Sequence, residues 1–184
     1  MKRFKVNIPE QETQNWYIKK VYGDSSSIYT NAIDRPCSGK AEPMDEYTFL
    51  CQKNPNSIVM ADTYHEYREH GHLWENASGD VLIGGLGLGL VNNFLIKCER
   101  VNSVTIIENS QEVIDIVWPY CEKNDKFCLI KANIEEYNPG MCWNYAWFDT
   151  YIQGNPLTHA EYKNKIINRY CDFCESINFW ESIP

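Results

Sequence analysis

Several polar residues follow apolar runs of this sequence, at positions where a folded sheet could bring them together. The glycine-rich stretch "GLGLG", residues 85–89, comes directly after the apolar run "VLIG". Glu108, Asn133 and Asp149 each end a later apolar run. Ligands of parallel α/β sheets bind outside the carboxyl ends of the strands. The order of these residues therefore predicts one ligand-binding site along one edge of such a sheet.

The glycine loop narrows the class of ligand. Gly85, Gly87 and Gly89 permit a tight turn and a close approach of the ligand to the backbone. A dinucleotide fingerprint would need a third glycine at Leu90 or Asn92, and neither position has one. The GxGxG spacing instead resembles the loop of class I S-adenosylmethionine (SAM) methyltransferases, which lies under the amino-acid part of the ligand. A plain strand–helix turn is the alternative.

The strand ends fit an adenosyl ligand. Glu108 ends the second strand, where an acid accepts hydrogen bonds from both ribose hydroxyls. Asn133 can accept from an adenine amino group through its side-chain carbonyl, with Ile134 packing on the ring. Asp149 should face the same pocket. A solvated carboxylate at Glu108 and a merely strand-ending Asn133 remain the alternatives.

The elements that must position these residues alternate between strand and helix from Asp62 onward. The apolar strands are continuous, as in a parallel sheet covered on both faces. We therefore predict an α/β fold with a Rossmann-like, doubly wound, mostly parallel sheet over 61–184, shortened at its C-terminal end. Residues 1–60 are predicted to form a small antiparallel β extension, which forms one compact unit with the Rossmann-like domain. The expected elements, in chain order, are strands "KRFKVNI", "WYIKKVY", "SSIYTNAI" and "EYTFLCQ", a helix "DTYHEYREHGHLW", strand "DVLIGG", helix "GLVNNFLIKCER", strand "SVTIIEN", a helix after Ser110 bent near Pro119, strands "FCLIKAN" and "WNYAWFDTY", helix "LTHAEYKNKIINRY" and strand "CDFCESINFW".

Composition limits the partners and the compartment. The net charge of −8 argues against a broad nucleic-acid footprint. No apolar stretch is long enough for a membrane span, and the first residues lack the apolar core of a secretory signal. We therefore expect a cytoplasmic protein whose eight cysteines are reduced thiols. The pair Cys171 and Cys174 lacks a second ligand pair, so no metal site is predicted.

Four segments together resemble the spermidine-synthase-like branch of the class I SAM methyltransferase superfamily. "YHEYREH", 64–70, matches the YHExxxH segment that precedes the first Rossmann strand in that branch. "VLIGGLGLG", "VTIIENSQEVIDI" and "NYAWFDTY" stand where VLIIGGGDGG, VTVVEIDPEVIEL and YDVIIVDSSDP are usual. A closer resemblance is to a group of uncharacterised small methyltransferase-like proteins of phages and bacteria, with "ADTYHE" and the tail "NRYCDFCESINFW". That origin implies the cytosol of a bacterium or an infected host.

The resemblance implies a set of site residues. Asp149 and His65 are the candidate catalytic groups. The cofactor, SAM or its products S-adenosylhomocysteine and methylthioadenosine, would be bound by Gly85, Leu86, Gly87, Gly89, Glu108, Asn109, Asn133, Ile134 and Asp149. The remaining pocket residues would be Asp62, Tyr64, His65, Glu66 and Tyr151. A homodimer is expected by analogy with the branch, with a small molecule of unspecified class as acceptor.

Some residues of this sequence differ from the pattern of the spermidine-synthase-like branch, and these differences rank three candidate functions. Aminopropyltransferases carry an acid in the glycine loop, where this chain has Gly87, and a second acid where it has Ile152. The primary interpretation is therefore a SAM-dependent methyltransferase. A protein that binds SAM or a nucleoside without transfer is the alternative, favoured by the short C-terminal part. A polyamine aminopropyltransferase is the second alternative.

Overall fold

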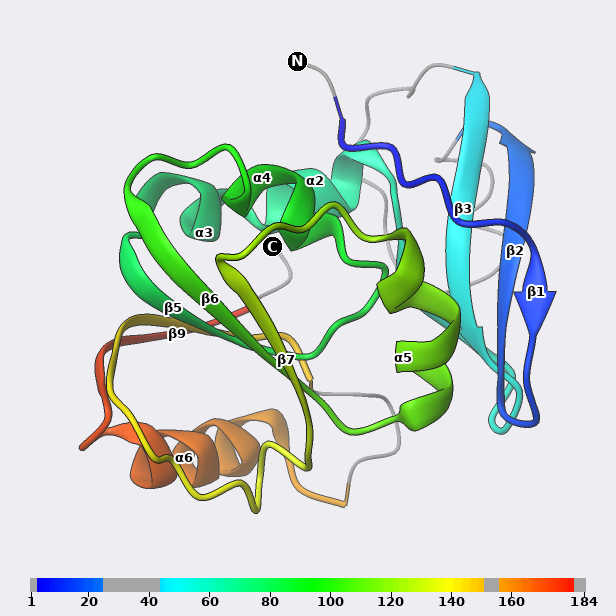
Figure 1. The fold of residues 1–184 in the computed structure, drawn as a ribbon. Helices are drawn as coiled ribbons and strands as arrows, with labels where there is room; N and C mark the ends of the chain where they lie inside the picture. The colour runs from blue at the N-terminus through cyan, green and yellow to red at the C-terminus, as the bar shows by residue number, and fades with distance from the viewer. Residues whose placement is uncertain (1–2, 25–43, 151–155, 181–184) are drawn as a thin grey trace.

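The computed structural model describes residues 3–24, 44–150 and 156–180, which form two sheets and the helices around them (Figure 1). The predicted strand "SSIYTNAI" and Tyr151 lie outside these residues. The strands are β1 (Gln11–Glu12), β2 (Trp16–Gly23), β3 (Asp45–Gln52), β4 (Ser57–Ala61), β5 (Gly79–Gly84), β6 (Val101–Glu108), β7 (Phe127–Lys131), β8 (Trp143–Phe148) and β9 (Cys174–Phe179). The helices are α2 (Tyr64–Glu69), α3 (Gly71–Asn76), α4 (Leu90–Leu95), α5 (Gln111–Val117), the 3₁₀ turn η1 (Trp118–Tyr120) and α6 (His159–Tyr170).

The larger sheet has the order β7-β6-β5-β8-β9, and all its strands are parallel. One face packs against α3, α4 and α5 in a shared apolar cluster. The other face packs against α6 through Tyr162, Ile166 and Tyr170 (Figure 1). The strand order reverses at β5, from which the chain winds first toward β7 and then toward β9. The predicted doubly wound α/β fold is confirmed.

The smaller sheet is an antiparallel meander of β1, β2, β3 and β4. It lies beside α5 (Figure 1). Glu112 of α5 accepts hydrogen bonds from the backbone and side-chain nitrogens of Asn15, at 2.8 and 2.6 Å, and the Gln11 amide donates to the Ile116 carbonyl at 2.9 Å. The expected antiparallel extension is present, and two of its strands, β1 and β4, lie outside the predicted strands.

The prediction of a strand over "KRFKVNI" is wrong for residues 3–8, the part of this segment that the structure describes. These residues have an irregular backbone. The backbone N–H of Val6 donates to Asp62 Oδ2 at 3.1 Å. The Arg3 guanidinium bonds to the Asp62 carboxylate at 2.8 Å and to Asp45 at 2.7 Å. Side chains therefore satisfy polar groups that a strand would satisfy through a neighbouring ladder.

The helix predicted over 62–74 is also wrong in detail, because it is two short helices that meet at His70. Thr63 caps α2 by accepting from the Glu66 N–H. Both the backbone N–H of His70 and its ring Nδ1 contact the Glu66 carbonyl, at 3.3 and 2.8 Å. A side chain that competes for a helical carbonyl disturbs the helix, and Gly71 follows immediately.

The aromatic residues of β8 pack as core. Trp143, Tyr145 and Trp147 alternate along the strand, a spacing that predicts one shared face, but the three do not share one. Tyr145 and Trp147 belong to the cluster on the α3–α5 side. Trp143 packs instead with Phe148 and Tyr170 on the α6 side. Its indole N–H donates to Thr105 Oγ1 at 3.3 Å on that side. Among the described helices, none is both long and apolar enough to cross a membrane.

The contacts of Asp45 predict a pH dependence of stability. Hydrogen bonds from Arg3 and then Lys5 hold the pKa of Asp45 below its usual value. A lowered carboxyl pKa contributes stability above the unfolded pKa of about 3.9, and the contribution is lost as the pH falls. Asp45→Asn should therefore cost at most about 1 kcal/mol at pH 7, since the pair is partly exposed. Urea unfolding should show this difference narrowing from about pH 4 toward pH 2; a difference independent of pH would contradict the prediction.

Candidate functional site

The carboxyl ends of four parallel strands bring the predicted site residues to one edge of the sheet. β5 ends at Gly84, immediately before the glycine loop, and its neighbours β6 and β8 end at Glu108 and Phe148. The Asp149 N–H donates to the Gly84 carbonyl at 3.1 Å, so Asp149 begins beside the loop. Asn133 follows β7 by two residues.

The glycine loop requires its glycines for conformation and for packing. Gly85, Gly87 and Gly89 have φ of +93°, +52° and +68°, which residues with a Cβ rarely adopt. A Cβ on Gly85 would lie 2.9 Å from the Asp149 carbonyl oxygen. A Cβ on Gly87 would collide with the thioether of Met60, whose sulfur accepts from the Leu88 N–H at 3.2 Å. The loop is therefore a fixed shape held by β4 on one side and by Asp149 on the other.

Glu108 fastens the glycine loop to the end of β6. Its Oε2 accepts from the Leu86 N–H at 2.9 Å, and its Oε1 accepts from the Ser110 N–H at 2.7 Å. Ser110 in turn caps α5 by accepting from the Val113 N–H, as predicted. A carboxylate has about four acceptor positions. Since Glu108 is only half-buried, it keeps capacity for further donors such as ligand hydroxyls.

Asn133 and its neighbours form a turn at the end of β7. The Asn133 side-chain carbonyl accepts from the Glu135 N–H at 3.0 Å. The Ile134 side chain is buried with Phe148 in the α6-side cluster, and its carbonyl accepts from the Tyr170 hydroxyl at 2.9 Å. Asn109, directly after Glu108, is exposed. The predicted adenine contacts of Asn133 and Ile134 stay predictions.

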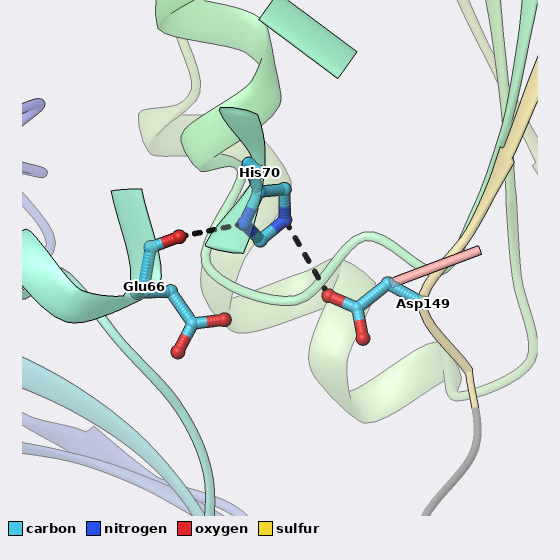
Figure 2. A group of neighbouring side chains, drawn as sticks. All are labelled: Glu66, His70 and Asp149. Carbon is cyan, nitrogen blue, oxygen red and sulfur yellow. Dashed lines mark hydrogen bonds and ion pairs between the residues drawn. The ribbon is translucent and has the colours of Figure 1, made fainter. Parts of the chain in front are cut away.

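Asp149 lies opposite His70, which comes from the junction of α2 and α3 (Figure 2). The His70 Nε2 is 3.5 Å from Asp149 Oδ2, and its Nδ1 is 2.8 Å from the Glu66 carbonyl oxygen. The ring also packs against Trp74 and Trp147. Glu66 contributes a carboxylate to the same group. One histidine and two carboxylates thus meet where the loop and β8 end.

The electrostatics of this group favour a charged His70. Complete burial alone would lower the His70 pKa, but the adjacent Asp149 carboxylate, followed by the charge of Glu66, outweighs it and raises that pKa. The carbonyl of Glu66 only accepts, so Nδ1 carries a proton and Nε2 faces Asp149. The ring is therefore held in one orientation.

Two of the predicted pocket residues have other partners. The His65 Nε2 lies 3.0 Å from the Glu69 carboxylate, one helical turn away. The buried Asp62 carboxylate accepts from Arg3, from the Val6 N–H and from the Thr48 N–H at 2.7 Å. Tyr64 is half-buried at the first position of α2. The catalytic and pocket roles of these residues stay predictions.

Sequence reasoning missed His70. The structure brings together Asp149 and Glu66 from the predicted set, and it adds His70 rather than His65. The signal was present, because His70 follows Glu66 by four residues and residues at this spacing share a helix face. His65 and Glu69 have the same spacing, so the pattern alone does not choose between the two histidines.

Gly85→Ala should lower the free energy of unfolding by about 2 kcal/mol, because it combines an unfavourable φ with a contact to the Asp149 backbone. The matched control is Gly140→Ala. That Cβ would meet nothing within 4 Å, so its effect should stay within about 0.5 kcal/mol. Urea unfolding measures both, and equal stability of the two variants would show that the loop tolerates a side chain.

Comparison with known proteins identifies the fold. No protein-family model and no curated protein matches the sequence. The spermidine synthase of Thermotoga maritima aligns with a TM-score of 0.51 and 15% identity, over 95% of this chain and 55% of that chain. DhpI in complex with SAH gives a TM-score of 0.45 and 15% identity, over 64% and 59% of the two chains. DhpI in complex with SAM and HEP gives a TM-score of 0.46 and 13% identity, over 61% of this chain and 52% of that chain. This chain therefore spans less than two thirds of the length of each.

Proposed function

We propose, on the premise of a class I SAM-methyltransferase-like fold, that this protein binds SAM at the carboxyl edge of its parallel sheet and transfers the methyl group to a small acceptor. One observation carries the proposal. The partly exposed Glu108 carboxylate bonds to the glycine loop at Leu86, and Asp149 lies on the other side of the same loop at Gly85. An acid, a glycine loop and a second acid at adjacent strand ends are suited to an adenosyl ligand.

The chain's own groups fit that ligand. Glu108 would accept the two ribose hydroxyls with the acceptor positions that Leu86 and Ser110 do not use. Asn133 would contact the adenine amino group. Because the loop and Glu108 are already bonded to each other, binding does not require the loop to be reordered first, which lowers the entropic cost of association.

Asp149 would act on the acceptor side of the site. SAM supplies a methyl group that its sulfonium has already activated, so the chain mainly has to place the acceptor in line. The Asp149 carboxylate would position an N–H or O–H acceptor and receive its proton. His70 faces that carboxylate with a fixed ring and would restrict its orientation.

An aminopropyl transfer is less well supported by the loop. The position at which such enzymes carry an acid is Gly87, and a Cβ there would collide with the Met60 thioether. An acidic side chain could enter only if Met60 moved. The favoured ligand is therefore SAM itself rather than its decarboxylated form.

Calorimetric titration with SAM, S-adenosylhomocysteine, methylthioadenosine and decarboxylated SAM tests the binding step. We expect SAM and S-adenosylhomocysteine to bind at one site per chain, and decarboxylated SAM to bind more weakly. If none of the four binds to the folded protein, the proposal is wrong. If decarboxylated SAM binds best, the aminopropyltransferase function takes its place.

Transfer is tested by incubating the protein with methyl-labelled SAM and a small-molecule cell extract. Asp149→Asn should lower incorporation of label about 100-fold, the lower end of the usual range for loss of a general base. Asp80→Asn is the matched control, since Asp80 lies near the opposite end of β5 and accepts from Ser103 at 2.6 Å. SAM binding without any incorporation would indicate a non-catalytic binding protein.

A further inference from the structure

We propose that Glu66, His70 and Asp149 form a binding site for one divalent transition-metal ion, of the Mn²⁺ or Zn²⁺ class. The three side chains come from α2, from the residue after α2 and from the residue after β8, and they converge in Figure 2. Each offers one ligand atom, and these atoms lie within 4.8 Å of one another. The site goes beyond the proposed function, because it concerns a cation rather than SAM.

Two buried polar atoms of this group lack hydrogen bonds. The Nε2 of His70 and the Oδ2 of Asp149 are both inaccessible to solvent, and neither has a hydrogen-bond partner among the described residues. The 3.5 Å between them exceeds the 2.7–2.9 Å of a charge-assisted hydrogen bond. Buried polar atoms almost always have a partner, and a cation between the two atoms would satisfy both.

The His70 imidazole has the orientation of a metal ligand. Metal-bound histidines almost always donate their other ring N–H to a carboxylate or a backbone carbonyl, which fixes the tautomer. The Nδ1 of His70 has such a partner in the Glu66 carbonyl, at 2.8 Å. Loss of the Nε2 proton would direct the Nε2 lone pair toward Asp149. Stacking on Trp74 and a tilted contact with Trp147 also restrain the ring.

The spacing of the His70 and Asp149 ligand atoms also suits a metal ion. Two ligand atoms bound at about 2.1 Å to a tetrahedral ion are about 3.4 Å apart. The observed 3.5 Å between His70 Nε2 and Asp149 Oδ2 matches this value. The Glu66 carboxylate is the third ligand, since its ligand atom lies within 4.8 Å of the other two. Three protein ligands leave a position for water or for an oxygen or nitrogen atom of an acceptor.

The donor set selects the class of metal. One imidazole with two carboxylates suits Mn²⁺, Fe²⁺ or Zn²⁺, whereas Mg²⁺ and Ca²⁺ prefer oxygen ligands alone. Two carboxylates also balance the charge of a divalent ion in a site where His70 is buried. The cysteines do not belong to this group, although Cys128, Cys142 and Cys171 are exposed and could bind Zn²⁺ independently.

Mn²⁺ is therefore the better probe, since thiolates select softer ions. The experiment is titration of chelator-treated full-length protein with Mn²⁺, followed by electron paramagnetic resonance and without SAM. We expect one tightly bound Mn²⁺ per chain with hyperfine coupling to a directly bound nitrogen. Glu66→Gln and Asp149→Asn should each weaken binding at least about tenfold, and Mg²⁺ should compete poorly.

The matched controls are Glu75→Gln and His72→Asn in the adjacent helix α3, where both residues are exposed. Each should leave Mn²⁺ affinity unchanged. The carboxamide variants keep the shape of the side chain, and circular dichroism establishes that they fold. The site is overturned if Mn²⁺ does not bind stoichiometrically or if the bound ion shows no nitrogen coupling. It is also overturned if Glu66→Gln and Asp149→Asn bind Mn²⁺ as tightly as the unaltered protein. SAM titration of the metal-free protein is a separate result, so either proposal can fail alone.

Discussion

Glu108→Ala should weaken SAM binding by about 10²–10⁴-fold. Hydrogen bonds to a charged group contribute about 1.5–3 kcal/mol each, and two ribose hydroxyls would donate to this carboxylate. A loss of about 3–6 kcal/mol corresponds to that range of affinity. The variant also removes the acceptor of the Leu86 and Ser110 N–H groups, so the loop loses its attachment to β6 at the same time. Calorimetric titration with SAM measures the effect.

A comparison with Glu108→Gln separates the two roles of Glu108. Glutamine keeps one acceptor oxygen for the loop but loses the charge and the second acceptor, so it should retain more of the fold than alanine and still lose most of the affinity. Asp80→Asn should leave SAM affinity unaltered. If Glu108→Ala folds and binds SAM within threefold of the unaltered protein, Glu108 does not contact the ribose.

Asp62→Ala should lower the free energy of unfolding by about 3–5 kcal/mol, the usual cost of removing one partner of a buried ion pair. The Asp62 side chain has no exposed surface, and its partner Arg3 is 4% exposed. The substitution leaves the Val6 and Thr48 N–H groups without their acceptor. It therefore removes the side-chain bonds by which Asp62 joins residues 3–8 to β3. Urea unfolding followed by circular dichroism measures the loss.

The matched control is Asp115→Ala, which removes an exposed acid that accepts from Gln111 within α5. Its effect should stay within about 0.5 kcal/mol. Should Asp62→Ala fail to fold, Asp62→Asn provides the graded measurement, because the amide keeps one acceptor for the backbone. A loss below about 1 kcal/mol in Asp62→Ala would mean that Asp62 is available as a pocket residue, as its place in the sequence suggested.

The parallel sheet could be predicted from the sequence because its determinants are local. Each of β5 to β8 contains a run of mostly apolar residues, and Ser110 shows where α5 begins. The irregular course of residues 3–8 could not be predicted, because it depends on Asp62, a residue more than 50 positions away in the chain. Local β propensity is outweighed there by a buried side chain that bonds to the backbone.

For the candidate site, too, the local features could be predicted from the sequence and the long-range contacts could not. The strand ends Glu108, Asn133 and Asp149 follow from the order of the strands. The partnership of Asp149 with His70 does not, since it depends on tertiary contacts of the residue that joins α2 and α3 with the end of β8. Nothing in the local pattern distinguishes His70 from His65. His70 lies at the break between α2 and α3, and its ring faces Asp149 from there.

The contacts between the N-terminal meander and α5 have a consequence for how the chain is made. Gln11 and Asn15 bond to residues 105 and 97 positions later. During synthesis the meander therefore emerges long before the helix that it contacts. Until α5 has left the ribosome, the side of the meander that faces that helix has no partner. Contacts of such sequence separation slow folding, so the nascent N-terminal strands should reach their packed state only after α5 has been made.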